Sequence, residues 1–524
     1  GISTAFLGAG ESITVQIEGL KKRACQFSLP IACLIVIITG FSTFSLEIAW
    51  FRSLTAAFRS TTDAFAIMLA SVLIALGVGA WIVPILKNRT ENIGPVLGWS
   101  GILILLTAPI IERFDIILFP HTSGLPIFLL VKWFIIILYV IGLPMLLLGI
   151  ALPWILDDQT TTRRWGTLYS LNALAAIFGS ICAGWILLPT IGVSKTVWLA
   201  GGLLILTAIF IAQKNKRKFL GAVGLSALFI AVIFESGIGR TRTQGWDLRN
   251  GIIPVKVLES YEGPDATTSV VEYENNGRSL IIDGFTATSQ TSLKEDNKQV
   301  SYMAWMGYLP MLLHPNPKNT LVICFGTGQT ANAVRNENPQ SLDIVDINPR
   351  VFKLAHNFPK NEAVLDDPRV KTILMDGRAY IRRTQKTYDV ITLEPMPPNF
   401  AGVNALYSKE FYEFARKKLN PDGTIAQWLP FHLVGTYHSA SIAKTFQSVF
   451  PNALLWVEPI YKTGILIASK NDDSNLGTSW PGLDRSKFPL PLTNDEMKKA
   501  VILDRNRLEI YSTYGDIIND DNQL

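Results

Sequence analysis

Long apolar stretches fill the first 236 residues of the chain and decide what it can fold into. A helix needs about 20 apolar residues to cross the hydrocarbon core of a bilayer. Seven stretches qualify, and they run from 28 to 50, 64 to 86, 93 to 111, 127 to 149, 169 to 188, 196 to 212 and 219 to 234. From about Arg240 onward the composition is that of an ordinary water-soluble protein. We therefore predict an N-terminal segment at 1–27, a transmembrane bundle of about seven helices at 28–236, and a soluble second half.

Basic residues between the spans predict how the bundle lies in the membrane. With the N-terminus in the cytoplasm, the inner set has Lys21, Lys22, Arg23, Lys87, Arg89, Arg163, Arg164, Lys214, Lys216, Arg217 and Lys218. The outer set has only Arg52, Arg59, Arg113 and Lys195. Because cytoplasmic loops carry the excess of lysine and arginine, we expect a cytoplasmic N-terminus. Seven spans then place the soluble half outside the cytoplasm.

Few residues of the first half suggest chemistry. Glu47 lies near the end of the first span, where a carboxylate is either functional or an interfacial group paired with Arg52 or another helix. Small residues at 77–80 and 201–202 favour close helix packing. The four cysteines form no CxxC pair, so no metal site is expected. No dense basic stripe with interleaved aromatic residues indicates a nucleic-acid partner.

The soluble half begins with a predicted β-hairpin. Apolar runs at 269–274 and 278–283 flank Asn275-Asn276-Gly277, a typical hairpin turn. A helix is expected at 298–313. Short apolar strands then alternate with helices, at 320–324, 342–345, 370–374, 390–393, 424–427, 453–457 and 464–468. The pattern predicts an α/β fold: a small β subdomain at 248–313, a Rossmann-like parallel sheet at 314–472, and a polar C-terminal tail at 473–524.

Three motifs lie where predicted parallel strands end. Gly326-Thr327-Gly328 follows the first strand, and its glycines allow a tight turn against a ligand at a helix N-terminus. Asp346 ends the second strand, at the spacing of an acid that binds ribose hydroxyls. Asp376-Gly377 follows the third strand and could contact an adenine amine. Each motif could also be an ordinary turn, but together they indicate a nucleoside site.

These motifs belong to a longer ordered series that resembles the spermidine synthase family. The series spans about 261–470 and includes the segments 282–284, 308–310, 326–328, 345–349, 367–370, 376–378, 388–391 and 406–412. The segments 46–52 and 168–172 are similar to the membrane half of bacterial membrane-fused members of that family. The resemblance implies a multi-pass protein of a bacterial-type inner membrane. The resemblance also implies a soluble domain of the S-adenosylmethionine-dependent methyltransferase fold.

The resemblance also implies a chemistry. Family members transfer an aminopropyl group from decarboxylated S-adenosylmethionine to an amine. By resemblance, Asp346 would bind the ribose, Asp376 and Gly377 the adenine, and Gly326, Thr327 and Gly328 would lie against the nucleoside.

The chain departs from the family on the amine side of the site. Thr327 stands where soluble members have an aspartate, and Ala287 and Met303 replace expected glutamines. The D-x-x-D pair becomes Glu394 and Pro397. A polyamine is a polycation that needs several carboxylates, and its reacting amine must lose a proton to a base. Glu394 is the remaining candidate base.

Three hypotheses follow. The first is a membrane-anchored transferase that uses decarboxylated S-adenosylmethionine, or a related adenosyl nucleoside, on an altered acceptor. The second is an inactive accessory subunit or scaffold of a larger membrane complex, without a cofactor. The third is transport through the bundle, supported only by Glu47 and Lys132. Membrane lipid is the expected partner, and protein partners and homo-oligomers stay open.

Overall fold

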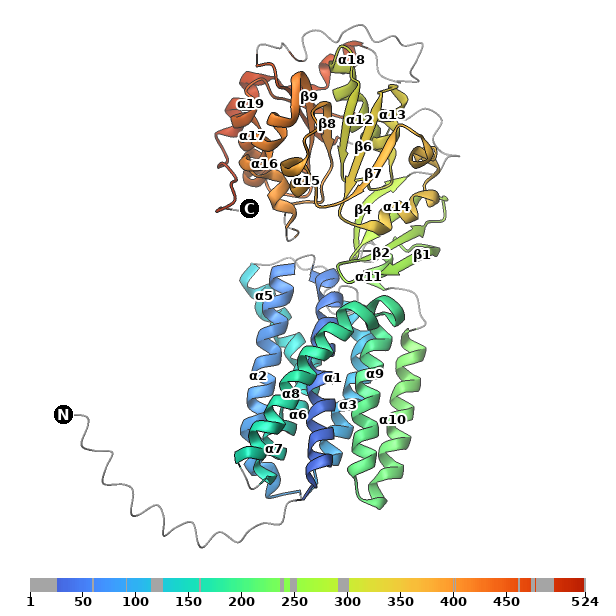
Figure 1. Ribbon diagram of the computed structural model, residues 1–524, viewed down its shortest axis with the longest axis vertical. Coiled ribbons are helices and arrows are strands. Elements are labelled where there is room, and N and C mark those ends of the chain that lie inside the picture. Colours follow the sequence, from blue (N-terminus) through green and yellow to red (C-terminus); the bar gives the residue numbers. More distant parts are fainter. Residues whose placement is uncertain are drawn as a thin grey trace, which may run out of the picture.

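The computed structural model describes residues 26–58, 61–90, 92–114, 126–159, 162–235, 240–245, 252–290, 301–398, 400, 402–459, 462–472, 476 and 494–522. A helical bundle forms one end of the molecule and an α/β domain the other, with a small β-sheet between them (Figure 1). The predicted N-terminal segment 1–27 lies outside the described residues except for Gln26 and Phe27.

The bundle consists of long apolar helices. They are α1 (Leu29–Phe58), α2 (Thr61–Lys87), α3 (Gly94–Ile111), α5 (Pro126–Ile137), α6 (Leu143–Gly149), α7 (Ala151–Asp158), α8 (Thr162–Cys182), α9 (Leu188–Ile211) and α10 (Lys214–Glu235), with π-helical turns at Leu138–Gly142 and Ala183–Leu187. Large apolar side chains such as Trp81 and Trp185 point outward and are more than 70% exposed. An outer surface of this kind suits contact with lipid.

Six helical stretches are long and apolar enough to cross a membrane. One of them, Arg163–Ile211, has 49 residues, about 74 Å if straight, which is more than twice the roughly 30 Å hydrocarbon core. The chain reverses within it at Gly192, whose φ is 81° and ψ 173°. This stretch therefore contains the predicted fifth and sixth spans as two helical parts joined at Gly192.

Contacts at the two ends of the bundle fix where the chain enters and leaves. The backbone N–H of Phe27 donates to Asp158 at the end of α7. Ser194, just after the Gly192 turn, donates to Glu235 at the end of α10. The chain thus enters the bundle at one end and leaves it at the other, beside the small sheet (Figure 1).

Glycines let helices of the bundle approach closely at some of the small residues at 77–80 and 201–202 that the sequence suggested. A Cβ on Gly79 would lie 2.2 Å from the Leu146 carbonyl oxygen, and one on Gly201 would lie 2.9 Å from that of Gly101. Gly77 and Gly202 face open space. Two of the four predicted glycines therefore allow helices to approach, consistent with close packing in a bilayer.

The small sheet has four antiparallel strands in the order β1-β2-β3-β4. They are β1 (Lys256–Glu262), β2 (Thr267–Glu272), β3 (Arg278–Ile282) and β4 (Phe285–Gln290). The predicted hairpin is confirmed, since β2 pairs with β3 around Asn276, whose φ is 59°. The β3–β4 turn places Asp283 and Gly284 at φ 45° and 80°, as in the tight turns that suit the twist of a hairpin.

The α/β domain is built on an eight-stranded sheet in the order β12-β10-β11-β9-β8-β5-β6-β7. The pairs β9–β8, β8–β5, β5–β6 and β6–β7 are parallel, and the pairs β12–β10, β10–β11 and β11–β9 are antiparallel. The strands are β5 (Asn319–Ile323), β6 (Ser341–Asp346), β7 (Val370–Leu374), β8 (Tyr388–Leu393), β9 (Leu419–Leu429), β10 (Leu454–Val457), β11 (Gly464–Ser469) and β12 (Val501–Leu503). The helices are α12 (Tyr302–Leu313), α13 (Gln329–Asn336), α14 (Pro349–Leu354), α15 (Gly377–Arg383), α16 (Lys409–Lys418), α17 (Thr436–Val449), α18 (Asn494–Lys499) and α19 (Arg505–Ser512). This confirms the predicted α/β class.

Two of the predicted domain boundaries differ from the structure. Helix α12, assigned to the small β subdomain, packs instead in the α/β domain, where Trp305 contacts Trp456 of β10 and Thr392 of β8 donates to the Met306 carbonyl. The described part of the predicted polar tail, 494–522, is not a tail. It adds edge strand β12 next to β10, and Leu508 and Ile518 enter the core.

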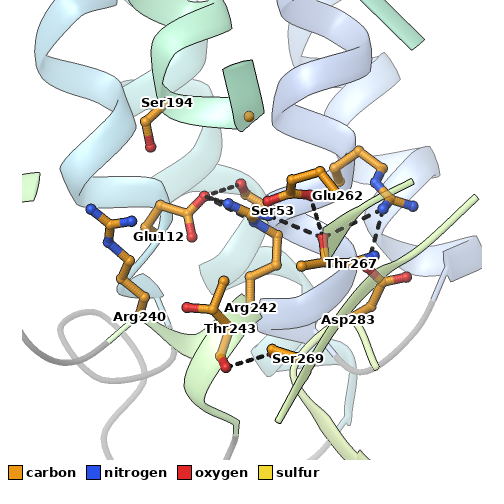
Figure 2. Close-up of polar contacts among 12 residues, drawn as sticks. Ser53, Glu112, Ser194, Arg240, Arg242, Thr243, Glu262, Thr267, Ser269 and Asp283 are labelled. Atoms are coloured by element: carbon orange, nitrogen blue, oxygen red, sulfur yellow. Dashed lines mark hydrogen bonds and ion pairs between the residues drawn. The ribbon is translucent and has the colours of Figure 1, made fainter. Parts of the chain in front are cut away.

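A buried group of charges joins the bundle to the small sheet (Figure 2). Arg242, in the short helix α11 (Thr241–Gln244), pairs with Glu112 at the end of α3 at 3.1 Å, and their side chains are 4% and 1% exposed. Arg242 also pairs with Glu262 of β1 and donates to Thr267 of β2 at 3.0 Å. Ser53 of α1 donates to Glu112 at 2.9 Å.

A second contact ties the β3–β4 turn to α1. Arg52 pairs with Asp283 at 3.4 Å, and the Thr267 amide donates to the same carboxylate at 2.9 Å. The sequence suggested that Arg52 could pair with Glu47. In the structure Arg52 pairs instead with Asp283 of the soluble half. Because buried charges are costly unless paired, these residues hold the sheet in one position on the bundle.

Candidate functional site

The glycine loop follows β5 and turns sharply into α13. Cys324, Gly326 and Gly328 have φ values of 72°, 55° and 83°. At Gly328 a Cβ would come within 2.7 Å of the Phe325 ring, so the turn needs glycine for space as well as for its positive φ. Thr327, between the glycines, is 1% exposed. The turn therefore places the start of α13, with its backbone amides, close to the carboxyl end of β5.

Asp346 lies against this loop from the end of the neighbouring strand β6. Its carboxylate accepts the backbone N–H of Phe325 and of Asn348, each at 2.8 Å. Burial raises the pKa of Asp346 to about 6, although hydrogen bonds from the backbone act in the opposite direction. The side chain is partly exposed, so the carboxylate has oxygen lone pairs left for a further donor.

Asp376 and Gly377 follow the next strand along the edge. Asp376 caps α15 by accepting the Ala379 amide at 2.7 Å, and its side chain is exposed. Gly377 is buried, and a Cβ there would lie 2.4 Å from Ile323 at the end of β5. Glycine therefore lets α15 begin close to the glycine loop.

Glu394 follows β8, on the other side of β5. Tyr302 hydrogen-bonds its carboxylate, and Thr330 of α13 donates at 3.5 Å, near the limit for a hydrogen bond. Burial raises the pKa of Glu394 to about 7, and the bonds from Tyr302 and Thr330 partly oppose this. A carboxyl group with a pKa near neutrality can exchange a proton at physiological pH.

The three predicted acids all affect the pKa of one side chain. Burial raises the pKa of the Cys324 thiol, and the carboxylates of Asp346, Glu394 and Asp376 raise it further. The fold therefore brings the three predicted acids together at the carboxyl ends of β5, β6, β7 and β8, where open α/β sheets bind ligands.

The surroundings of Thr327 are neutral. The Thr327 hydroxyl lies 3.7 Å from the Met303 sulfur and accepts from Gln329 at 3.0 Å. Thr288 of β4 also contacts the Met303 sulfur. Pro397, in place of the second acid of the expected pair, is buried. Among these residues no carboxylate is present to balance a second positive charge.

Comparison with known proteins identifies the family. Residues 299–477 match the family model described as spermine/spermidine synthase domain. The chain is 30% identical over 216 residues to a polyamine aminopropyltransferase of Bacillus mycoides (strain KBAB4), covering 39% of this chain and 74% of that protein. The chain belongs to the polyamine aminopropyltransferase family.

Other relatives show how far the likeness extends. Polyamine aminopropyltransferase 1 of Streptomyces coelicolor is 24% identical over 412 residues, 73% of this chain and 72% of that protein. An alignment of that length exceeds the soluble half, so it also includes part of the helical bundle. The solved spermidine synthase of Thermotoga maritima covers 52% of this chain and 94% of its own, with 21% identity and a TM-score of 0.41.

Some residues near the aminopropyltransferase-like site were not singled out from the sequence. Tyr302, the first residue of α12, is one of them. Ile347 and Leu374, 63% and 58% exposed, extend apolar side chains beside Asp346 and Asp376, where a flat base could stack. Buried Gln427 pairs in register with Leu393, next to Glu394. The available signal for Ile347 and Leu374 was an exposed aliphatic residue at a strand end: Ile347 directly follows the buried strand β6, and Leu374 is the last residue of β7.

Proposed function

We propose that the protein is a membrane-anchored transferase that moves an aminopropyl-type group from an adenosyl sulfonium donor to an amine. The observation that carries this proposal is the meeting of Asp346, Asp376 and Glu394 around the glycine loop. A domain kept only as a scaffold has no need to hold three acids against the same turn. The family's donor is decarboxylated S-adenosylmethionine, and it is the donor we propose here.

The donor's nucleoside would lie along the ends of β5, β6 and β7. The Asp346 carboxylate would accept hydrogen bonds from the ribose hydroxyls, and Asp376, with the backbone at Gly377, would contact the adenine. The positive φ of Gly326 and Gly328 lets the backbone approach the nucleoside without a Cβ in the way. Ile347 and Leu374 would cover the faces of the base.

The reaction needs one base. The lone pair of the acceptor nitrogen attacks the methylene carbon next to the sulfonium, and the carbon–sulfur bond breaks. Its electron pair passes to sulfur, which leaves as the neutral thioether of 5′-methylthioadenosine. Glu394 accepts the proton that the ammonium must lose. Tyr302 and Thr330 would hold the carboxylate in position, and a base of this kind contributes about 10²- to 10⁴-fold to a rate.

Calorimetry on the full chain in nanodiscs tests the donor site. We expect 5′-methylthioadenosine to bind, and Asp346→Asn to weaken binding by about 10- to 100-fold, the value of a hydrogen bond to a charged group. Glu413→Gln is the matched control, because Glu413 is exposed on α16, outside the proposed site. No binding at millimolar nucleoside would refute the transferase.

The orientation of the bundle is a separate proposal. The end where the chain enters carries eight basic residues, Lys87, Arg89, Arg163, Arg164, Lys214, Lys216, Arg217 and Lys218, which favours that end in the cytoplasm. Seven passes then put the α/β domain on the side of the membrane opposite the cytosol. Adenosyl donors are made in the cytosol. A reporter fused after Leu524 tests this. An external signal is expected, and a transferase would then need its donor supplied on that side of the membrane. A cytoplasmic signal would overturn the orientation and leave the transferase proposal intact.

A further inference from the structure

The edge of the sheet that holds the acids faces the membrane bundle. Helix α14 begins at this edge, at the end of β6, and it lies with the small sheet on the bundle side of the α/β domain, whereas α18 lies on the far side (Figure 1). On the same edge, Leu433 and Tyr437 follow β9 and are 47% and 50% exposed. The candidate site therefore lies on the side of the α/β domain that faces the helical bundle.

A short chain of polar contacts fixes this orientation. At the bundle end, Thr267 accepts from Arg242 at 3.0 Å. Its neighbour Thr268 accepts from Asn348 at 2.8 Å, in a buried contact. The Asn348 amide in turn donates to Asp346. Only a few residues separate the charges at the bundle (Figure 2) from the proposed ribose acid, so the sheet sets both the height and the tilt of the site.

The acceptor side of the site suits one ammonium followed by an apolar body. Among the described residues that contact Met303, Thr327 or Thr330, Glu394 supplies the one carboxylate, which accepts from Thr330. Apolar residues follow Glu394 in the chain: Met396 and Pro397, and then Phe400, whose ring packs on Phe285 of β4 with ring centroids 5.0 Å apart. A free diamine would leave its second ammonium without a carboxylate, which is costly in a partly desolvated site.

We infer, resting on the transferase proposed above, that the acceptor is a bilayer-borne primary amine, an aminophospholipid headgroup, and not a free polyamine. The headgroup brings one amine to Glu394 while its acyl chains stay in the membrane. The atoms balance as before: a new nitrogen–carbon bond forms on the lipid, the carbon–sulfur bond of the donor breaks, and the proton leaves on Glu394.

The test uses the full chain in nanodiscs with a donor labelled in its aminopropyl group. One set of discs contains phosphatidylcholine alone, and the other contains phosphatidylcholine with phosphatidylethanolamine. Putrescine is the soluble acceptor in a parallel reaction. Two quantities are measured: 5′-methylthioadenosine released, and label recovered in the lipid extract or in the aqueous phase.

We expect release that depends on phosphatidylethanolamine, with the label in the lipid extract. Release with putrescine and label only in the aqueous phase would overturn the lipid acceptor but leave the transferase intact. No release with either acceptor, from protein that binds the nucleoside, would overturn the proposed function and the lipid acceptor with it.

A variant separates the two acceptors in one protein. Pro397→Asp returns a carboxylate to the position of the second acid. We expect it to raise the ratio of putrescine to lipid product by about tenfold or more, because it pairs the second ammonium. Pro398→Asp is the matched control, also at a buried proline. An equal change in both variants, or no change in the ratio, would count against the assignment of the acceptor side.

Discussion

Replacing Arg242 by methionine should loosen the joint between bundle and small sheet. Methionine keeps most of the length of the side chain but removes the charge that Glu112 and Glu262 share. Glu112, 1% exposed, would keep only the Ser53 hydroxyl as its side-chain donor. Removing one partner of a buried pair costs about 3–5 kcal/mol. We expect the lower end, about 3 kcal/mol, because Ser53 stays and Glu262 is 15% exposed and can be hydrated.

Hydrogen exchange measures this loss directly. Two backbone bonds depend on the joint: the Thr241 amide donates to the Glu112 carbonyl, and the Gly284 amide donates to the Arg242 carbonyl. A cost of about 3 kcal/mol corresponds to roughly 100-fold easier opening, at 1.4 kcal/mol per factor of ten. In nanodiscs, the exchange of both amides should therefore accelerate about 100-fold, while β5 and β6 keep their rates.

Two controls decide whether the reasoning is right. Arg240 pairs with Glu235 but is 31% exposed, so Arg240→Met should change exchange by less than tenfold. Combining Arg242→Met with Glu112→Leu removes both buried charges and should restore much of the protection. If the double variant exchanges as fast as Arg242→Met alone, the uncompensated Glu112 charge is not the cause. Equal effects of the two arginine variants would refute the special role of Arg242.

Three further predictions concern the site. The transfer rate should fall about tenfold per pH unit below pH 7, because a base with a pKa of about 7 must be ionised to act. In a pH series of methylthioadenosine release, Glu394→Gln should lose this acidic limb of the pH–rate profile and at least 99% of the rate. Tyr302→Phe, which removes a bond that lowers the Glu394 pKa, should move the same limb to higher pH, and an unmoved limb would rule out that bond. Gly377→Ala should destabilise the domain by about 1–3 kcal/mol through overpacking against Ile323, measured by thermal unfolding, and Ile323→Ala in the same chain should recover part of the loss.

The fold was largely predictable because its signals are local. Apolar length predicted the helical stretches of the bundle, including the two helical parts of Arg163–Ile211 on either side of Gly192. Strand β7 has the predicted bounds, and β5, β6 and β8 differ from prediction by one or two residues at an end. Strand β12 was missed because three residues carry no periodicity, and only pairing with β10, far earlier in the chain, makes them a strand.

The site was predictable on its nucleoside side and less so on its amine side. Asp346 and Asp376 end neighbouring strands, so the topology of a parallel sheet already brings them together. Tyr302 reaches Glu394 only because α12 packs across the sheet next to β8. The buried charges between the bundle and the small sheet could not be predicted either, because their pairing also depends on tertiary packing. Arg52, Glu112, Arg242 and Glu262 are each unremarkable at the end of a helix or strand, and their pairing depends on how the two halves dock.

The segment 494–522 has a consequence for how the protein is made. Ile518 accepts the Lys409 amide of α16, Asp520 pairs with Arg378 of α15, and Gly515 accepts from Lys444 of α17. Translation delivers these residues after every other described part of the chain. Three helices of the domain therefore wait for their last contacts while the bundle, already made, enters the membrane. The domain can therefore complete its packing only after the segment 494–522 has been synthesised, which is later than the bundle that precedes it in the chain.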